Sequence, residues 1–257
     1  MMPSVTLTAI PDLPDFKPGD DLAKAVGNAL VAAGFAPQDG DILCVAQKVF
    51  SKVEGCIVKL ATVKPSQSAQ DYATQLNKDA RKVEVILGQS SRVLRAFKHE
   101  DQNEGTMICR HKLGFTSANA GVDESNLDEP GTVMTLPADP DASAQELADA
   151  LGARFSVQIG VVMTDTFGRP WRLGQVNVAI GLANVPATMR LEGEADGWGR
   201  PLTVTEPALA DELSAAAGLV MAKSAKTPVV LVRGLRWHRT VSSAVQLVRA
   251  EKEDMFT

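Results

Sequence analysis

The chain has 257 residues, of which 45% are hydrophobic and 22% are charged, a balance typical of a folded globular protein and not of a disordered one. Lysine and arginine total 26, aspartate and glutamate total 31, and the formal net charge is -5. An acidic chain without a basic block is poorly suited to nucleic-acid binding, although a few local cations or a metal ion can still hold a polyphosphate in a pocket.

Three widely spaced cysteines, Cys44, Cys56 and Cys109, form no CxxC pair, which favours buried thiols in a reducing compartment. The opening residues MMPSVTLTAIPDLPDF lack the basic start of a secretory signal. The apolar stretches are too short to span a bilayer. We therefore expect a cytoplasmic protein without a membrane partner.

In chain order, the apolar pattern predicts helices and strands that alternate without strict βαβ order. An amphipathic helix is expected over 20–33, ended by Gly34, and a second over 207–222, with a proline in its first turn. Residues 67–88 are expected to be mostly helical; the other predicted helices are 141–152 and 241–251, and the predicted strands are 41–46, 106–110, 131–136, 157–164 and 228–232. The expected class is α+β, with mixed sheets and packed helices.

The densest group of polar residues follows the apolar strand 157–164, in the text TDTFGRPWRLGQ. Asp165 comes just beyond a buried strand, and it and the hydroxyl of Thr166 are hard oxygen ligands suited to Mg²⁺ or Mn²⁺. Arg169 and Arg172 follow, with Pro and Trp between them, and suit a clamp on phosphate or carboxylate oxygens. The alternative is a capped turn with two surface arginines.

A second polar group lies in the text SANAGVDESN at 117–126. Its small residues let the backbone approach a ligand closely. Asp123 could complete a metal site with Asp165 across the fold, and Asn126 could hydrogen-bond a ligand without adding charge. The alternative is an ordinary turn.

A third group combines LPDF at 13–16 with QKVFSKVEG at 47–55. Lys48 and Lys52 lie four residues apart after a predicted strand, where they either point at phosphates or are solvated. Neither a GxxxxGK[ST] loop nor a GxGxxG fingerprint is present. No HExxH or GxSxG motif occurs, which argues against a zinc site and a serine nucleophile.

Eight stretches in order along the chain resemble the coenzyme F420-0:L-glutamate ligase (gamma-glutamyl ligase) family. They are LTAIPDLPDFKPGDDL (7–22), GDILCVAQKVFSKVEG (40–55), SRVLR (91–95), ICRHKLGFTSANAGVDESN (108–126), LPADPDASA (136–144), TDTFGRPWRLGQVNVAIG (164–181), ADELSAAAGLVMAK (210–223) and VVLVRGL (229–235). The resemblance implies one gamma-glutamyl ligase-like domain over residues 1–257, without the nitroreductase-like second domain of some actinobacterial relatives.

The resemblance implies a reaction. GTP converts a carboxylate of the deazaflavin side chain of the coenzyme F420 precursor into an acyl phosphate, and the amino group of L-glutamate attacks it to form an amide. Later glutamates are added through gamma-linkages. The resemblance also implies Mg²⁺ or Mn²⁺, K⁺ as a further ion, and a homodimer with an intertwined α+β fold. Phosphoryl transfer needs positioning and charge neutralisation more than a protein nucleophile, which fits the residues present.

The resemblance also assigns residues. The nucleotide pocket is implied to be lined by Leu13, Pro14, Asp15, Phe16, Lys52 and Asn126, and by Gln47, where some relatives have Ser. The divalent cations are implied to bind Asp123, Asp165 and Thr166. We add Arg169 and Arg172 as catalytic candidates that bind phosphates or the acceptor carboxylate.

Two departures from the family pattern concern the substrates more than the activation chemistry. Glu192 stands where relatives carry Arg, and Val176-Asn177-Val178 replaces Thr-Asp-Val in the usual GQTDVAIG. They leave open a related nucleotide-dependent acid–amino acid ligase with a different acceptor or amino acid. A third possibility is a catalytically inactive nucleotide-binding regulator.

Overall fold

The computed structural model describes residues 4–191, 195–221 and 226–254, so Glu192 lies outside the described residues. A five-stranded sheet in the order β1-β10-β2-β8-β9 forms its centre. The strands are β1 (Thr6–Ala9), β10 (Val229–Arg233), β2 (Ile42–Ala46), β8 (Gly160–Arg169) and β9 (Arg172–Ala183). β2 and β8 are parallel and the other neighbours are antiparallel. The α+β class with mixed sheets is thereby confirmed.

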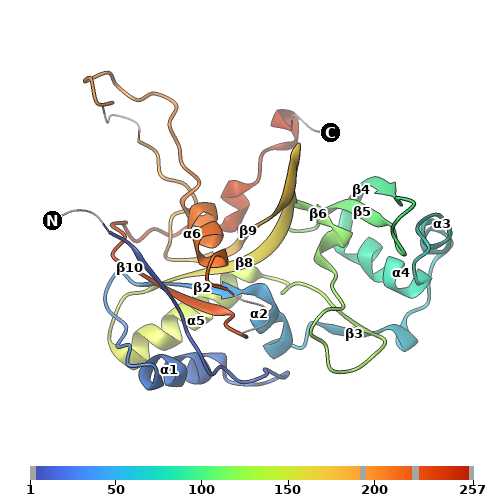
Figure 1. The fold of residues 1–257 in the computed structure, drawn as a ribbon, viewed down its shortest axis with the longest axis horizontal. Coiled ribbons are helices and arrows are strands. Elements are labelled where there is room, and N and C mark those ends of the chain that lie inside the picture. The colour runs from blue at the N-terminus through green and yellow to red at the C-terminus, as the bar shows by residue number, and fades with distance from the viewer. Residues whose placement is uncertain (1–3, 192–194, 222–225, 255–257) are drawn as a thin grey trace.

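Helices cover both faces of this sheet (Figure 1). α1 (Leu22–Ala32) and α5 (Pro140–Phe155) pack on the face that carries Leu43, Val45 and Val161. α6 (Leu209–Gly218) packs on the opposite face, against Cys44 and Val162. Because β2 and the first half of β8 are buried on both faces, their sequences read as continuous apolar runs.

A second group of elements comes between α2 (Gln47–Val53) and α5 in chain order and lies to the right in Figure 1. This group has its own apolar core, separate from the two cores on the faces of the central sheet. It contains η1 (Leu60–Thr62), α3 (Gln67–Leu76), α4 (Ala80–Gln89), η2 (Asn119–Gly121), the sheet β4 (Ser90–Phe97), β5 (Thr106–His111) and β6 (Thr116–Ala118), and the pair β3 (Ile57–Lys59) and β7 (Thr132–Met134).

The structure corrects several predicted elements. The predicted strand 157–164 extends to Arg169, and β9, which was not predicted, pairs with it as a long hairpin. Asp165 and Thr166 therefore lie within a strand, not after one. The expected helical stretch 67–88 is two helices, because Asn77 takes the left-handed conformation at φ 53° and ends α3.

The predicted helix 241–251 is wrong. The segment forms only the short 3₁₀ turns η3 (Ala244–Leu247) and η4 (Glu251–Glu253). The Asp141 carboxylate accepts hydrogen bonds from Ser243 Oγ at 2.5 Å and from Ala244 N at 3.1 Å. These bonds tie the segment to the start of α5, and Val241 stays fully exposed.

The predicted helix 207–222 is shorter at both ends, and Ala222 lies outside the described residues. The three cysteines are free thiols, and Cys44 and Cys109 are buried as expected. Among the residues that the structure describes, no helix is long and apolar enough to cross a membrane.

Candidate active site

A cleft of about 360 Å³ lies at the carboxyl end of β2 and beside the middle of β8, where the parallel pairing of the two strands ends. Adjacent parallel strands end at the same edge of a sheet, a common position for ligand sites. The cleft is lined by Leu13, Pro14, Asp15, Phe16, Ala46, Gln47, Lys48, Val49, Lys52, Asn126, Thr164, Asp165, Thr166, Gln175, Asn177, Gly218, Met221, Lys226, Thr227 and Pro228.

The cleft brings together all seven predicted nucleotide residues and two of the three predicted cation ligands. The seven come from the segment 13–16, from α2 and from the loop that holds Asn126; Asp165 and Thr166 come from β8. A second cleft, of about 520 Å³, contains none of the predicted site residues.

α2 follows β2 without a break and supplies two lysines to the cleft. Lys48 and Lys52 are four residues apart on this helix, a spacing that places them on one side, and both line the cleft. Gln47 is buried, and its Oε1 accepts a hydrogen bond from Ser51 Oγ at 2.8 Å. The helix therefore presents a fixed amide and two long cationic side chains to the cleft.

A third lysine, Lys226, was not predicted. Its Nζ lies 2.7 Å from Asp15 Oδ2, and both side chains are exposed at the cleft. The hydrogen bond and charge of Lys226 hold the pKa of Asp15 below its ordinary value. The signal in the sequence was its position just before the buried strand β10, whose start pairs with the end of β2.

Thr166 is oriented by the neighbouring strand. Its hydroxyl lies 3.0 Å from Asn177 Oδ1, the register partner on β9. Because the amide oxygen can only accept, the hydroxyl is the donor, and its own lone pairs stay available to a ligand. Asp165 Oδ1 accepts from Thr166 N at 2.8 Å. Asn177 thus takes part in the cleft.

Asp123, the third predicted cation ligand, lies next to the cleft and does not line it. Lys48 Nζ is 2.5 Å from Asp123 Oδ2, and Ser125 N donates to Oδ1 at 2.7 Å. Burial opposes ionisation of Asp123, but the hydrogen bonds from Lys48 and Ser125 outweigh it and lower its pKa. Asp123 is therefore held as a carboxylate.

The donor set suits Mg²⁺, which proteins bind through one or two carboxylates together with substrate phosphates. Asp165 and the hydroxyl of Thr166 provide such donors in the cleft. Within the described ranges, no three or more His, Cys, Asp and Glu side chains cluster as a metal site. A cation here would thus depend on phosphate oxygens to complete its shell.

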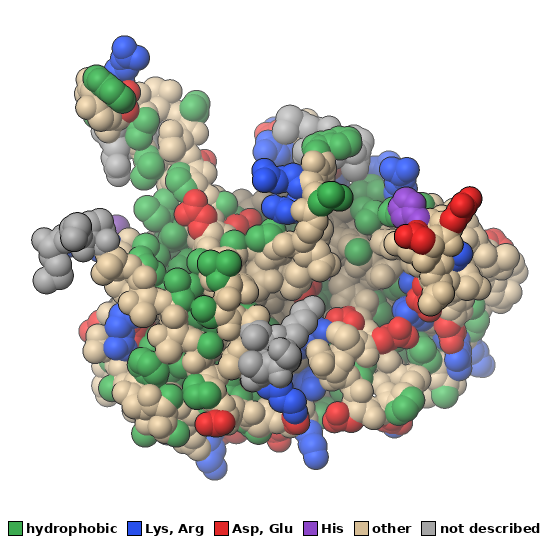
Figure 2. Space-filling view, in the orientation of Figure 1, with side chains coloured by type: hydrophobic (Ala, Val, Ile, Leu, Met, Phe, Trp, Pro, Cys, Tyr) green, Lys and Arg blue, Asp and Glu red, His purple; other side chains and the backbone are tan. Residues whose placement is uncertain are grey.

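Arg169 and Arg172 lie outside the cleft, at the two sides of the β8–β9 turn. Arg169 Nη2 donates to the carbonyl of Leu173 at 2.6 Å, and Arg172 is exposed. Trp171 and Leu173 are 88% and 97% exposed. In Figure 2 the end of this hairpin projects from the body, as does the arm formed by 188–191 and 195–206.

The protein has an α+β fold whose cleft combines three lysines with the carboxylates of Asp15 and Asp165. The sequence model of the family described as F420-0:Gamma-glutamyl ligase matches residues 12–234. The chain belongs to this family and is a ligase, as the sequence resemblance predicted.

Relatives match over almost their whole length. The coenzyme F420:L-glutamate ligase of Methanothermobacter thermautotrophicus is 38% identical over 98% of both chains. The one from Methanopyrus kandleri is 41% identical over 91% of this chain and 89% of its own. The one from Methanocaldococcus jannaschii is 34% identical over 95% of this chain and 94% of its own.

Proposed function

We propose that this chain joins L-glutamate to F420-0 and uses GTP to activate the acceptor carboxylate. One observation carries the proposal: the segment 13–16, α2 and Asn126 line the same cleft as Asp165 and Thr166. Residues implied to hold a nucleotide and residues implied to hold a cation therefore share one cavity. The family and the matching relatives supply the acceptor and the amino acid.

In this proposal, Lys48, Lys52 and Lys226 bind phosphate oxygens of GTP and offset their negative charge. A carboxylate oxygen of F420-0 attacks the γ-phosphorus, the bond to the β-phosphate oxygen breaks, and GDP leaves. The neutral amine of glutamate then attacks the acyl carbon, the carbon–oxygen bond to phosphate breaks, and phosphate leaves as the amine gives up a proton to water. No protein nucleophile is required.

Asp165, Thr166 and Asp123 would hold Mg²⁺ or Mn²⁺, which when bound neutralises charge on the phosphate oxygens. Thr166 fits this role because its hydroxyl donates its hydrogen to Asn177, which leaves the oxygen lone pairs to face a cation. Asp123 fits it because its carboxylate is held ionised beside the cleft. We assign no residues to K⁺.

We further propose a homodimer in the cytoplasm. Trp171 and Leu173 are nearly fully exposed at the hairpin end, where burial against a second copy would remove apolar area from water. Such contact would give Arg169 and Arg172 a route to the substrates of the second copy's cleft. Free thiols fit a reducing compartment.

A mass-spectrometric end-point assay tests the proposal. The purified chain is incubated with GTP, Mn²⁺, L-glutamate and F420-0, with ATP, no-acceptor and no-glutamate controls. A product heavier by one or more glutamyl groups, with one GDP per glutamate, is expected. GTP binding without any product would favour the related ligase with another acceptor or amino acid, and a screen of carboxylates and amines would follow.

A further inference from the structure

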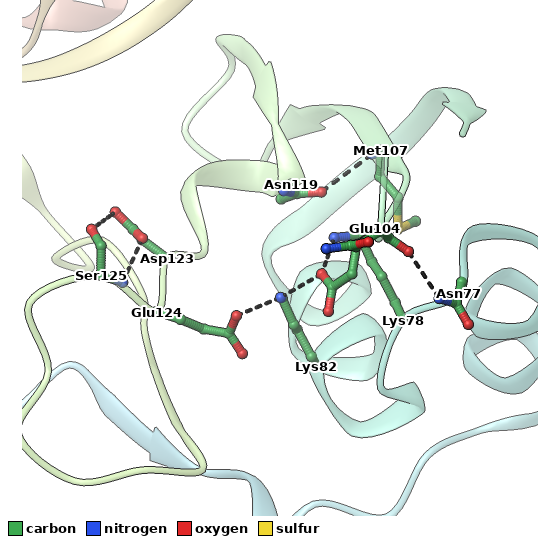
Figure 3. A network of polar contacts seen from close by, with 10 residues as sticks. Asn77, Lys78, Lys82, Glu104, Met107, Asn119, Asp123, Glu124 and Ser125 are labelled. Carbon is green, nitrogen blue, oxygen red and sulfur yellow. Dashed lines mark hydrogen bonds and ion pairs between the residues drawn. The ribbon is translucent and has the colours of Figure 1, made fainter. Parts of the chain in front are cut away.

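A buried lysine lies outside the cleft, on α4. The side chain of Lys82 is 8% exposed, and lysines are almost never this buried unless they are paired. Its Nζ is 2.8 Å from Glu104 Oε2 and 2.6 Å from Glu124 Oε2 (Figure 3). Lys82 therefore joins the segment before β5 to the loop after η2.

The partner Glu124 stands between two residues of the candidate site. Asp123, just before it, contacts Lys48 of α2. Asn126, two residues after it, lines the cleft at a φ of 60°. The loop 123–126 is thus attached from one side to α4, through Lys82, and from the other side to α2, through Lys48.

The two ion pairs that hold the loop respond differently when a phosphate binds in the cleft. Lys48 lines the cleft, so a phosphate there competes with Asp123 for its ammonium group. Lys82 lies on α4 and does not line the cleft, so its pair with Glu124 can persist when the cleft fills. The backbone pair of Asp123 with Met134, at 3.0 and 2.8 Å, holds the loop only where it begins.

We propose that Lys82 is a positioning residue, whose ion pair with Glu124 sets the loop 123–126 so that Asp123 and Asn126 reach the nucleotide and its cation. The inference rests on the assignment of the cleft as the GTP site. Neither Lys82 nor Glu124 touches the substrates in this scheme. Their effect passes through the position of the loop.

The structure offers a matched control, because Lys82 has a second carboxylate partner. Glu124→Gln removes the partner of Lys82 in the loop 123–126, and Glu104→Gln removes its partner before β5. Each variant leaves one ion pair to Lys82, and each replaces an exposed carboxylate by an amide of the same shape. Glu104 also pairs with the buried Lys78, so Glu104→Gln removes more of the structural contacts than Glu124→Gln does. A purely structural role for Lys82 would make Glu104→Gln at least as damaging as Glu124→Gln.

The experiment measures the Kd for GTP by calorimetry without metal, the KM for GTP, and the half-saturating Mn²⁺ concentration of the full chain. Glu124→Gln is expected to raise all three quantities on the order of 10-fold or more, since small displacements of positioning groups have large effects. Glu104→Gln is expected to keep wild-type values. Lys82→Arg is expected to restore most of what Lys82→Met loses.

Equal changes in the two glutamine variants, or wild-type values in Glu124→Gln, would overturn the inference. If Lys82→Met does not fold, the two glutamine variants and Lys82→Arg still decide the matter. Failure of the proposed function is distinguishable, because the wild-type chain would then neither bind GTP nor form product.

Discussion

Lys48 Nζ lies 2.5 Å from Asp123 Oδ2, and this pair connects α2 to the loop after η2. The pair occupies both groups, yet the proposed function needs each of them elsewhere. A phosphate in the cleft attracts Lys48, and a divalent cation attracts Asp123. Binding of GTP with its cation therefore exchanges one pair of opposite charges for two, which lowers the electrostatic cost of opening the Lys48–Asp123 pair.

We expect Asp123→Asn to reduce kcat/KM at least about 100-fold, the scale of losing a group that stabilises transferring charge. The unfolding free energy should fall by only about 1 kcal/mol, because the Asp123 side chain is 38% exposed and solvent screens its pair. Steady-state assays and chemical denaturation measure the two effects. A loss of stability several times larger would mean that Asp123 is chiefly structural.

Lys48→Met tests separately whether Lys48 and Asp123 exchange partners when GTP and its cation bind. In a double-variant cycle for GTP affinity with Asp123→Asn, the two substitutions should be non-additive, because each frees the partner of the other. Additive effects on the Kd would contradict the exchange of partners.

Asp165→Asn is expected to abolish turnover while the fold and GTP binding without metal are kept. The amide keeps the shape of the side chain but loses the charge that attracts a cation. Mass-spectrometric product formation, thermal melting and calorimetry measure the three properties. Asp71→Asn on α3, an exposed carboxylate far along the chain, is the matched control. Turnover in Asp165→Asn at near wild-type rate would exclude Asp165 from the cation site.

The site was predicted in part because two kinds of signal were present. The apolar run before Asp165 marked a buried strand. The parallel pairing of β2 with β8 places the end of this apolar run beside the start of α2. The first half of β9 gives no apolar run, because residues 172–178 are exposed or half-buried; its buried second half, 179–183, did offer an apolar run that was not predicted as a strand. Lys226 was missed although it stands just before a buried strand, because its pair with Asp15 joins residues 211 positions apart. The nucleotide residues came from the family resemblance and not from spacing.

Stability is expected to fall in acid because His111 is buried. Burial, with a smaller contribution from Lys112, lowers the pKa of His111 to about 4, and Nδ1 accepts from Leu113 N at 3.0 Å. The unfolded chain takes up a proton near pH 6.5 and the folded chain does not. Stability is therefore full above pH 6.5 and is lost as the pH falls toward 4, by about 3 kcal/mol for this residue.

Denaturant unfolding at several pH values between 7 and 4 measures this loss. His111→Asn keeps an acceptor for Leu113 N and removes the titrating ring, so its stability should vary less with pH over this range. His99→Asn, at an exposed histidine, should follow the wild-type curve. The same pH dependence in all three proteins would place the acid sensitivity elsewhere.

The hairpin end is expected to carry the dimer contact. Trp171→Asn should weaken a dimer, because it removes a large apolar side chain that is 88% exposed in the single chain. Asparagine tolerates the φ of 60° at this position, so the turn itself should persist. Light scattering after size exclusion should show wild-type mass at twice 27.3 kDa and a concentration-dependent decrease for the variant.

The matched control is Val31→Ser on α1, which removes another exposed apolar side chain. It should leave the mass unchanged. If Trp171→Asn stays a dimer with wild-type affinity, or if the wild-type chain is a monomer, the hairpin contact is wrong. In the monomer case, Arg169 and Arg172 would have no second cleft to serve, and their proposed catalytic role would fail with it.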